Sequence, residues 1–371
     1  MKATFAHMGT SPLIFKMLLE DLGYEVVFPP KPSQSTLSLG AQYAPEFACI
    51  PFKIVLGTYL EVIKDHPDIT IISAGGFGPC RAGYYGELQL KILQDLGYNP
   101  DMIFFWPPLR KPWDFYQKVL RVKRSCPWWR FIQILRKVWK KAIYLDDLEL
   151  LSFKVRAREI ERGSTTRALQ QGLSYLAEAK TMKEIDEARE AAFKELKNVP
   201  VDNRRSVLKV GIVGEIYVQL EPSANFHIEE VLGEMGVEPR RSIMLTNYAR
   251  HDVFSKGDIK TAKLASPYLD QKIGGHGQNS IGDVIRYAQK GYDGVIQLAP
   301  FTCIPEIVAK SIMPALSRDY DIPVMTLFID EQTGQAGVET RLEAFVDLMR
   351  QRYMRKVAGD EKSVIKSAIA L

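Results

Sequence analysis

Two stretches of this chain alternate short apolar runs with helical patterns, and this alternation is the strongest constraint on its fold. The first stretch contains the apolar runs ATFAHM, ITIISA and DMIFFW, separated by helical patterns such as SPLIFKMLLEDLGY. The second contains LKVGIVG, YDGVIQLA and IPVMTLFID, separated by patterns such as IGDVIRYAQKG. Alternation at this spacing predicts βαβ units, in which helices cover both faces of a parallel sheet.

A helical and highly charged segment separates the two alternating stretches. Its first part, RKPWDFYQKVLRVKRSCPWWRFIQILRKVWKKAIY, holds eleven lysines and arginines against one aspartate. We predict a first α/β domain over residues 1–106, a helical insertion over 107–205 and a second α/β domain over 206–371. The expected fold class is therefore α/β, with two Rossmann-like or flavodoxin-like domains and a helical insertion.

The composition excludes several classes of protein. No stretch of about 18 uncharged apolar residues is present, so no membrane partner is expected. The N-terminus reads as a strand, a turn and a helix instead of a signal peptide, which predicts a cytoplasmic protein. The formal net charge of +5 suits an anionic small molecule but falls well short of a nucleic-acid signature.

Four cysteines are spread over the 371 residues, a pattern that differs from the disulfide framework of a small secreted domain. Cys80 and Cys303 each follow an apolar run and a proline-containing turn, in ITIISAGGFGPC and GVIQLAPFTC, and each precedes a helical pattern. Cys49, in ACIPFK, also stands where a loop becomes a helix. Ligands of open parallel sheets bind beyond the carboxyl ends of the strands, so we expect Cys80 and Cys303 to face a crevice of that kind.

The spacing of the three cysteines limits what they can bind. No CxxC pair is present, which excludes a zinc finger and a ferredoxin-type ligand run. Three thiolates from separate segments could hold an iron-sulfur cluster and leave one iron open to water or substrate. The alternative is that each is an ordinary buried thiol, as buried free cysteines often are.

The same motifs resemble a known family. ACIPFK, GGFGPCRAGYYGE, GGHGQNSIGDVIRYAQKGYDGVIQLAPFTCIPE and LFIDEQTGQAGVETRLEAF are similar to the 2-hydroxyacyl-CoA dehydratase superfamily, and within it to the activase-related, dehydratase-like iron-sulfur proteins. The resemblance implies a 4Fe-4S cluster bound by Cys49, Cys80 and Cys303 in the cleft between the domains, reduced by an ATP-dependent activase. It also implies relatives that form a ketyl radical and expel a hydroxyl group from an acyl-CoA.

Other functions stay open beside this expectation. One is a lyase (dehydratase) or an ATP-coupled reductase acting on an acyl-CoA or another small molecule, and another is a non-catalytic electron-accepting or scaffold partner of the activase. Some relatives hold a double-cubane iron-sulfur cluster with six thiolates, which here would have to be shared between two chains. The resemblance to this family implies a homodimer, and a cluster shared between two chains would require one. A metal-free ligand-binding protein is the remaining alternative.

Several polar residues are secondary candidates. Glu215 follows a strand and His276 stands in a glycine turn, so both are weak catalytic candidates. We expect the helix after GGHG to have Asn279 or Ser280 as its N-cap. Near the cysteines, Glu46 and Arg81 could adjust the hydrogen bonding and charge of a cluster, or form ordinary loop salt bridges.

The basic and aromatic segment before residue 145 suggests nucleic-acid or membrane binding, but a buried helical stripe is the simpler interpretation. Cys126 lacks a preceding strand, so we leave it out of the ligand set. The helical spacing of the apolar residues predicts one buried stripe, with the basic residues on the solvated face or directed at coenzyme A phosphates or an acidic partner. The residues of this stripe are Trp128, Phe131, Ile132, Leu135 and Trp139.

Overall fold

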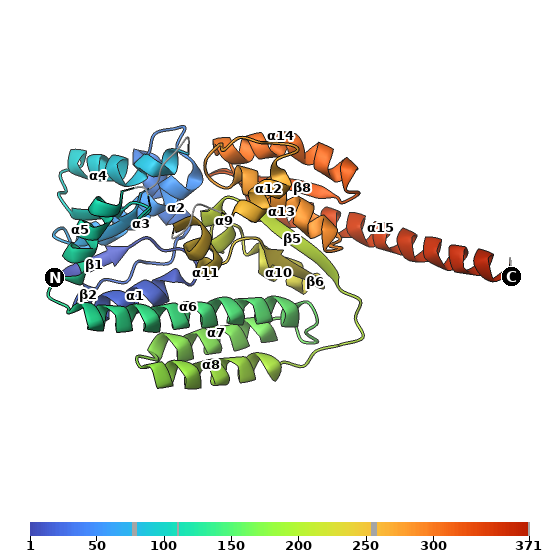
Figure 1. Ribbon diagram of the computed structural model, residues 1–371, viewed down its shortest axis with the longest axis horizontal. Helices are drawn as coiled ribbons and strands as arrows, with labels where there is room; N and C mark the ends of the chain where they lie inside the picture. Colours follow the sequence, from blue (N-terminus) through green and yellow to red (C-terminus); the bar gives the residue numbers. More distant parts are fainter. Residues whose placement is uncertain (76–79, 110, 254–257, 370–371) are drawn as a thin grey trace.

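The computed structural model describes residues 1–75, 80–109, 111–253 and 258–369, with backbone alone at 252–253 and 358–369. It contains two four-stranded parallel sheets, with the strand orders β2-β1-β3-β4 and β6-β5-β7-β8. Helices lie between consecutive strands, so the predicted α/β class is confirmed. Figure 1 shows the two sheets side by side, with a layer of long helices along one margin of the molecule.

The first sheet comes from the first 105 residues. Its strands are β1 (Lys2–Phe5), β2 (Glu25–Val26), β3 (Thr70–Ala74) and β4 (Asp101–Phe105). Its helices are α1 (Ser11–Asp21), α2 (Gln34–Tyr43), α3 (Ile50–Asp65), the 3-10 helix η1 (Arg81–Tyr84) and α4 (Tyr85–Asp95). The carboxyl ends of all four strands meet at one edge, because every pairing in the sheet is parallel.

Helices α2 and α3 form a tight hairpin that depends on two glycines. Ser33 and Thr36 form a capping box that begins α2. A Cβ atom on Gly40 would lie 1.7 Å from the carbonyl oxygen of Lys53, and one on Gly57 would lie 1.9 Å from that of Thr36. The hairpin therefore requires glycine at both crossing positions.

Four helices fill the predicted insertion. They are α5 (Pro112–Lys123), α6 (Trp128–Arg156), α7 (Ser164–Glu178) and α8 (Met182–Lys197). The helical segment is interrupted between α5 and α6, where Arg124 has a φ of 52° and Pro127 precedes the new helix. Among the described residues, no helix is both long enough and apolar enough to cross a membrane.

The predicted buried stripe on α6 is wrong for three of its five residues, while Phe131 and Trp139 are half-buried. Trp128, Ile132 and Leu135 are exposed by 43%, 48% and 42%, while Ile134 and Val138 are buried. Helix α6 packs against α1, α7 and α8 through the face that carries Ile134, and Phe131 is half-buried at the margin of this face. The exposed members of the stripe lie on the adjacent side of the helix. The helical period was recognised correctly, but the face was not, because both faces of this helix carry apolar residues.

The second sheet occupies the C-terminal part of the chain. Its strands are β5 (Leu208–Gly214), β6 (Val237–Arg241), β7 (Gly294–Pro300) and β8 (Val324–Ile329). The helices are α9 (Ile216–Leu220), α10 (Ile228–Glu234), α11 (Leu245–Tyr248), a π-helical turn (Ala249–Val253), α12 (Ile259–Ala265), α13 (Gly277–Gln289), α14 (Ile304–Asp319) and α15 (Gln335–Ile369). Helix α15 packs on this sheet at its start and then extends away from the body (Figure 1).

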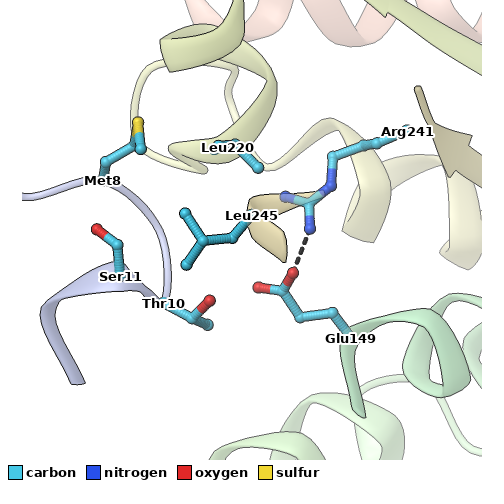
Figure 2. Close-up of a pocket in the computed structure, with 7 residues that line it drawn as sticks. All are labelled: Met8, Thr10, Ser11, Glu149, Leu220, Arg241 and Leu245. Carbon is cyan, nitrogen blue, oxygen red and sulfur yellow. Dashed lines mark hydrogen bonds and ion pairs between the residues drawn. The ribbon is translucent and has the colours of Figure 1, made fainter. Parts of the chain in front are cut away.

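Buried polar contacts join the three parts of the chain. Lys53 of α3 forms an ion pair with Glu331, whose oxygen lies 2.5 Å from Nζ. At the end of β6, Arg241 pairs with Glu149 of α6, a contact that Figure 2 shows beside a small cavity, and with Glu229 of α10. The helical segment is therefore tied to the second sheet by charge as well as by packing.

The hydrophobic cores do not follow the order of the sequence. Leu37 of α2, with Ile50 and Ile54 of α3, packs into the same core as β5, β7 and the start of α15. The helical hairpin thus packs against both sheets, because the rest of α3, from Phe52 to Ile63, lies in the core of the first sheet.

Candidate functional site

Each of the three candidate cysteines immediately precedes a helix. Cys49 caps α3, Cys80 caps η1 and Cys303 caps α14. Pro51 and Pro305 stand in the first turns of α3 and α14, where a proline loses no hydrogen bond. Residues 76–79 of the glycine-rich stretch before Cys80 lie outside the described residues.

Two of the cysteines occupy equivalent places in the two sheets. Cys80 follows β3 and Cys303 follows β7, and each of these strands is the third in its sheet's sequence order. In both sheets the strand order reverses beside this third strand, where open parallel sheets form a crevice. The expectation that both thiols lie at a carboxyl end of a sheet therefore holds.

The three thiols lie within electrostatic reach of one carboxyl group, that of Glu215. Burial, followed by the Glu215 carboxylate, raises the pKa of Cys49 to about 11. Burial is also the main reason why the pKa values of Cys80 and Cys303 are raised, and the same carboxylate adds to both shifts. The charge of Cys80 also raises the pKa of Cys49, and the charge of Cys49 raises the pKa of Cys303. Residues from both sheets thus converge on one buried group.

Contacts across the two halves surround the cysteines. A Cβ atom on Gly275, whose φ is 51°, would lie 3.8 Å from Sγ of Cys80 and 3.1 Å from Pro305. Arg81, next to Cys80, donates from its guanidinium to the carbonyl oxygen of Thr302 at 2.6 Å. The Arg81 side chain therefore bridges the two cysteine-bearing loops, a role that the sequence did not indicate.

A tyrosine that the sequence analysis missed touches the site. The hydroxyl of Tyr85 hydrogen-bonds Sγ of Cys49, and its ring packs edge-on against Phe52 with the centroids 4.9 Å apart. Burial, followed by the charge of Cys49, raises the pKa of Tyr85, which keeps the phenol protonated. The only sequence signal was the position of Tyr85, five residues after Cys80.

Glu215 begins α9 directly after β5, as its predicted place at a strand end required. Its Oε2 accepts a hydrogen bond from the Val218 amide at 3.1 Å, and burial raises its pKa to about 7. A second carboxyl group, Glu306, was missed. Glu306 is completely buried in the first turn of α14, and it accepts hydrogen bonds from Gln297 at 2.8 Å and Ser280 at 3.1 Å. Burial raises its pKa to about 7 as well.

His276 directly follows Gly275, the residue that lies beside Cys80. Burial lowers the pKa of His276 to about 4, so its ring is neutral at pH 7. The predicted N-cap of the following helix is wrong: α13 starts at Gly277 with His276 at the cap, and Ser280 is inside the helix. The error came from the turn GGHG, in which the helix starts inside the glycines.

Two other sequence candidates lie outside this group. Cys126 is in the α5–α6 connection, where its thiol faces the carbonyl of Pro127 at 3.6 Å. Glu46 is exposed, and its backbone carbonyl accepts a hydrogen bond from Lys53. Neither side chain has a contact with the three thiols among the interactions of the described residues.

The exposed large side chains next to the cysteines in the sequence are apolar or aromatic. Four exposed side chains flank the cysteines in the sequence, and Phe47 also packs under the Arg81 guanidinium at 5.7 Å. These residues are Phe47, Tyr84, Phe301 and Ile304, exposed by 65%, 67%, 57% and 50%. In the part of the chain that the structure describes, no three His, Cys, Asp or Glu side chains are arranged to hold a single metal ion.

The fold and the site define an α/β protein with two parallel sheets and three cysteines that lie near one carboxyl group. No protein-family model matches the chain, and no curated protein matches its sequence.

Proposed function

We propose that Cys49, Cys80 and Cys303 are the thiolate ligands of an iron-sulfur cluster, and that the protein performs one-electron chemistry at an iron without a protein thiolate. The observation that supports this proposal is the convergence of three thiols from two sheets on Glu215. The 4Fe-4S type is the expected one, because three thiolates leave one of four irons open.

The protonation of the site fits the binding of a positively charged group. Buried thiols and carboxyls raise one another's pKa values because several negative charges are unfavourable together in a low dielectric. Iron binds the thiolate form, so loading of a cluster would release protons and relieve this repulsion. The backbone N–H groups of Phe52, Ala82 and Glu306 lower the pKa of the sulfurs that they face, and in a loaded site they would stabilise the thiolates.

The three cysteines come from separate segments of the chain and not from one short sequence motif. A cluster with several irons carries one thiolate on each iron, so its ligands stand further apart than those of a single ion. The missing Cβ of Gly275 leaves space beside Cys80 that any other residue would fill. Both features favour a bulky inorganic group over a single metal ion.

The wider assignment rests on the motifs. We propose that the chain is a 2-hydroxyacyl-CoA dehydratase-type protein of the activase-related group, with flavodoxin-like domains and an ATP-dependent activase as its electron donor. When bound, the cluster would supply a low-potential electron and an open iron to a ligand. Neutral His276, Glu215 and Glu306 are then the groups that can hold or give a proton near that ligand.

Anaerobic purification followed by iron and sulfide analysis tests the cluster. We expect about four irons per chain, brown absorbance near 400 nm and a paramagnetic signal after reduction. Cys80→Ser should remove most of the iron, and Cys126→Ser is the matched control that should keep it. An iron-free protein under strict anaerobiosis, or equal iron in both variants, would contradict the proposal.

A second candidate function is that of an electron-accepting partner without turnover of its own. The exposed residues beside the cysteines, Phe47, Tyr84, Phe301 and Ile304, favour a protein surface over a small molecule at this place. Assays with an activase, ATP and a series of 2-hydroxyacyl-CoA substrates separate the two candidates. Product formation supports the enzyme, whereas cluster reduction without product supports the electron-accepting partner.

A further inference from the structure

An exposed aromatic patch lies on α5, on the residue Leu109 before it and on the start of α6. Eight large apolar side chains between residues 109 and 135 are exposed, and Trp113 and Trp129 are the most exposed of them, at 69% and 64%. The others are Leu109, Tyr116, Leu120, Trp128, Ile132 and Leu135. We call these eight residues the aromatic patch.

The patch is a continuous surface. Trp113 stacks on Tyr116 within α5, with the ring centroids 5.7 Å apart. Tyr116 stacks in turn on Trp128 of α6, with the centroids 6.1 Å apart and the rings 9° from parallel. The exposed stripe of α5 therefore joins the exposed stripe of α6 through a ladder of rings.

Basic residues outnumber acidic ones around the patch. Arg121, Arg130 and Arg136 are exposed on the same two helices, and Arg124 directly follows α5. Lys123 places its ammonium 4.9 Å from the centre of the Trp128 ring, while Asp114 pairs with Lys118 and Asp101 pairs with Arg121. The whole segment 110–144 contains only one acidic residue. The surface would therefore attract an anionic partner.

We propose that the aromatic patch binds the surface of a bilayer that contains anionic phospholipid. Tryptophan and tyrosine are the side chains favoured at the membrane interface, and lysine and arginine beside them attract anionic headgroups. Helix α5 and the start of α6 lie at the end of the molecule opposite to the C-terminal end of α15, so a flat surface can reach them (Figure 1).

Charge argues against a second copy of the chain as the occupant. A two-fold interface places each patch against an identical one, so the arginines of one copy would face those of the other. Such juxtaposition of like charges across an interface is unfavourable. The same positive charge is favourable against phospholipid headgroups.

The intrinsic fluorescence of the protein offers a direct test. All five tryptophans lie between residues 106 and 139, so the emission reports this region and no other. Titration with vesicles of phosphatidylglycerol and phosphatidylcholine should shift the emission to shorter wavelength and increase its intensity. Pure phosphatidylcholine vesicles should bind at least about tenfold more weakly, and added salt should weaken binding to the mixed vesicles.

Two pairs of variants separate membrane binding from loss of folding, with co-sedimentation as the readout. Trp113→Ala combined with Trp129→Ala should weaken vesicle binding about tenfold or more, whereas Ile160→Ala combined with Ile259→Ala should not, although both isoleucines are 67% exposed. Arg130→Glu combined with Arg136→Glu should also weaken binding, and Arg204→Glu is the matched control for charge. Circular dichroism should show unchanged melting in each variant.

Three results would overturn the proposal. The first is the absence of binding to anionic vesicles, and the second is binding that the tryptophan and arginine variants leave unchanged. The third is a concentration-dependent dimer that the Trp113 and Trp129 variants dissociate, because the occupant would then be a second copy.

Discussion

Nδ1 of His7 lies 2.8 Å from Oε2 of Glu221, and this buried contact joins the end of β1 to the end of α9 in the other half of the molecule. The same oxygen accepts a hydrogen bond from the Gly9 amide at 2.8 Å, and Oε1 accepts one from the Ser223 hydroxyl at 2.7 Å. Glu221 is therefore a buried carboxyl group with every oxygen satisfied.

Glu221→Gln should lower the free energy of unfolding by about 2 kcal/mol at pH 7, because the buried hydrogen bonds to a charged acceptor are replaced by weaker ones. Burial alone raises a carboxyl pKa, but the hydrogen bonds from His7, Ser223 and Gly9 reverse this effect and hold the pKa of Glu221 below its usual value. A pKa that is lower in the folded state stabilises the folded protein at pH values above the pKa of the unfolded state, which is near 4.5. This stabilisation is lost as the pH falls through the pKa of the folded state. Urea unfolding from pH 7 to pH 3 should show the two proteins converging in acid.

Arg241→Met should lower the free energy of unfolding by about 3 to 5 kcal/mol at pH 7, because it leaves Glu149 and Glu229 buried without their cation. Burial raises the pKa of Glu149 even though the charge of Arg241 lowers it. Without the arginine this carboxyl can avoid its charge by protonation, so the loss should shrink as pH falls. Arg158→Met, which breaks the more exposed pair with Glu238, should cost only about 1 kcal/mol. Equal losses for both variants would contradict this account.

Gly40→Ala should destabilise the protein by about 3 kcal/mol, because its new methyl group would overlap the backbone of α3. Gly337→Ala is the matched control. Gly337 lies in the exposed first turn of α15, where nothing stands within 4 Å of an added Cβ, so alanine should stabilise by about 0.5 kcal/mol. Thermal unfolding of both variants checks the opposite signs.

Glu215→Gln should make the three thiols of the metal-free protein more reactive. The Glu215 carboxylate raises the pKa of Cys49, Cys80 and Cys303, so its removal favours the thiolates. Because burial raises the pKa of Glu215 itself to about 7, the difference should appear above neutral pH, where the wild-type carboxyl is charged. Alkylation by iodoacetamide, followed by mass spectrometry of each cysteine peptide, should be several-fold faster in the variant at pH 8. Glu46→Gln should react at the wild-type rate.

The alternation of strands and helices was readable from the sequence because it depends on local hydrophobic period. The parallel sheets and the positions of Cys80 and Cys303 after equivalent strands followed from it. The helix over residues 34–43 was missed, because STLSLGAQY has a weak apolar pattern and its two glycine contacts with α3 are visible only in three dimensions.

The site was readable only in part, for a similar physical reason. Cys80, Cys303 and Glu215 could be found because each follows a strand, and Cys49 because it stands where a loop becomes a helix. Tyr85 and Glu306 could not, because their roles depend on contacts with Cys49, Gln297 and Ser280 that are distant in the sequence. The exposed face of α6 was misread because hydrophobic period identifies a face but not the neighbour that covers it.

The packing of the α2–α3 hairpin has a consequence for unfolding. Leu37, Ile50 and Ile54 leave the core of the second sheet when the first sheet unfolds, so the second sheet does not keep an intact interior alone. Unfolding of the first sheet should therefore destabilise the second, and a fragment that begins near residue 206 should be molten or aggregate instead of folding independently.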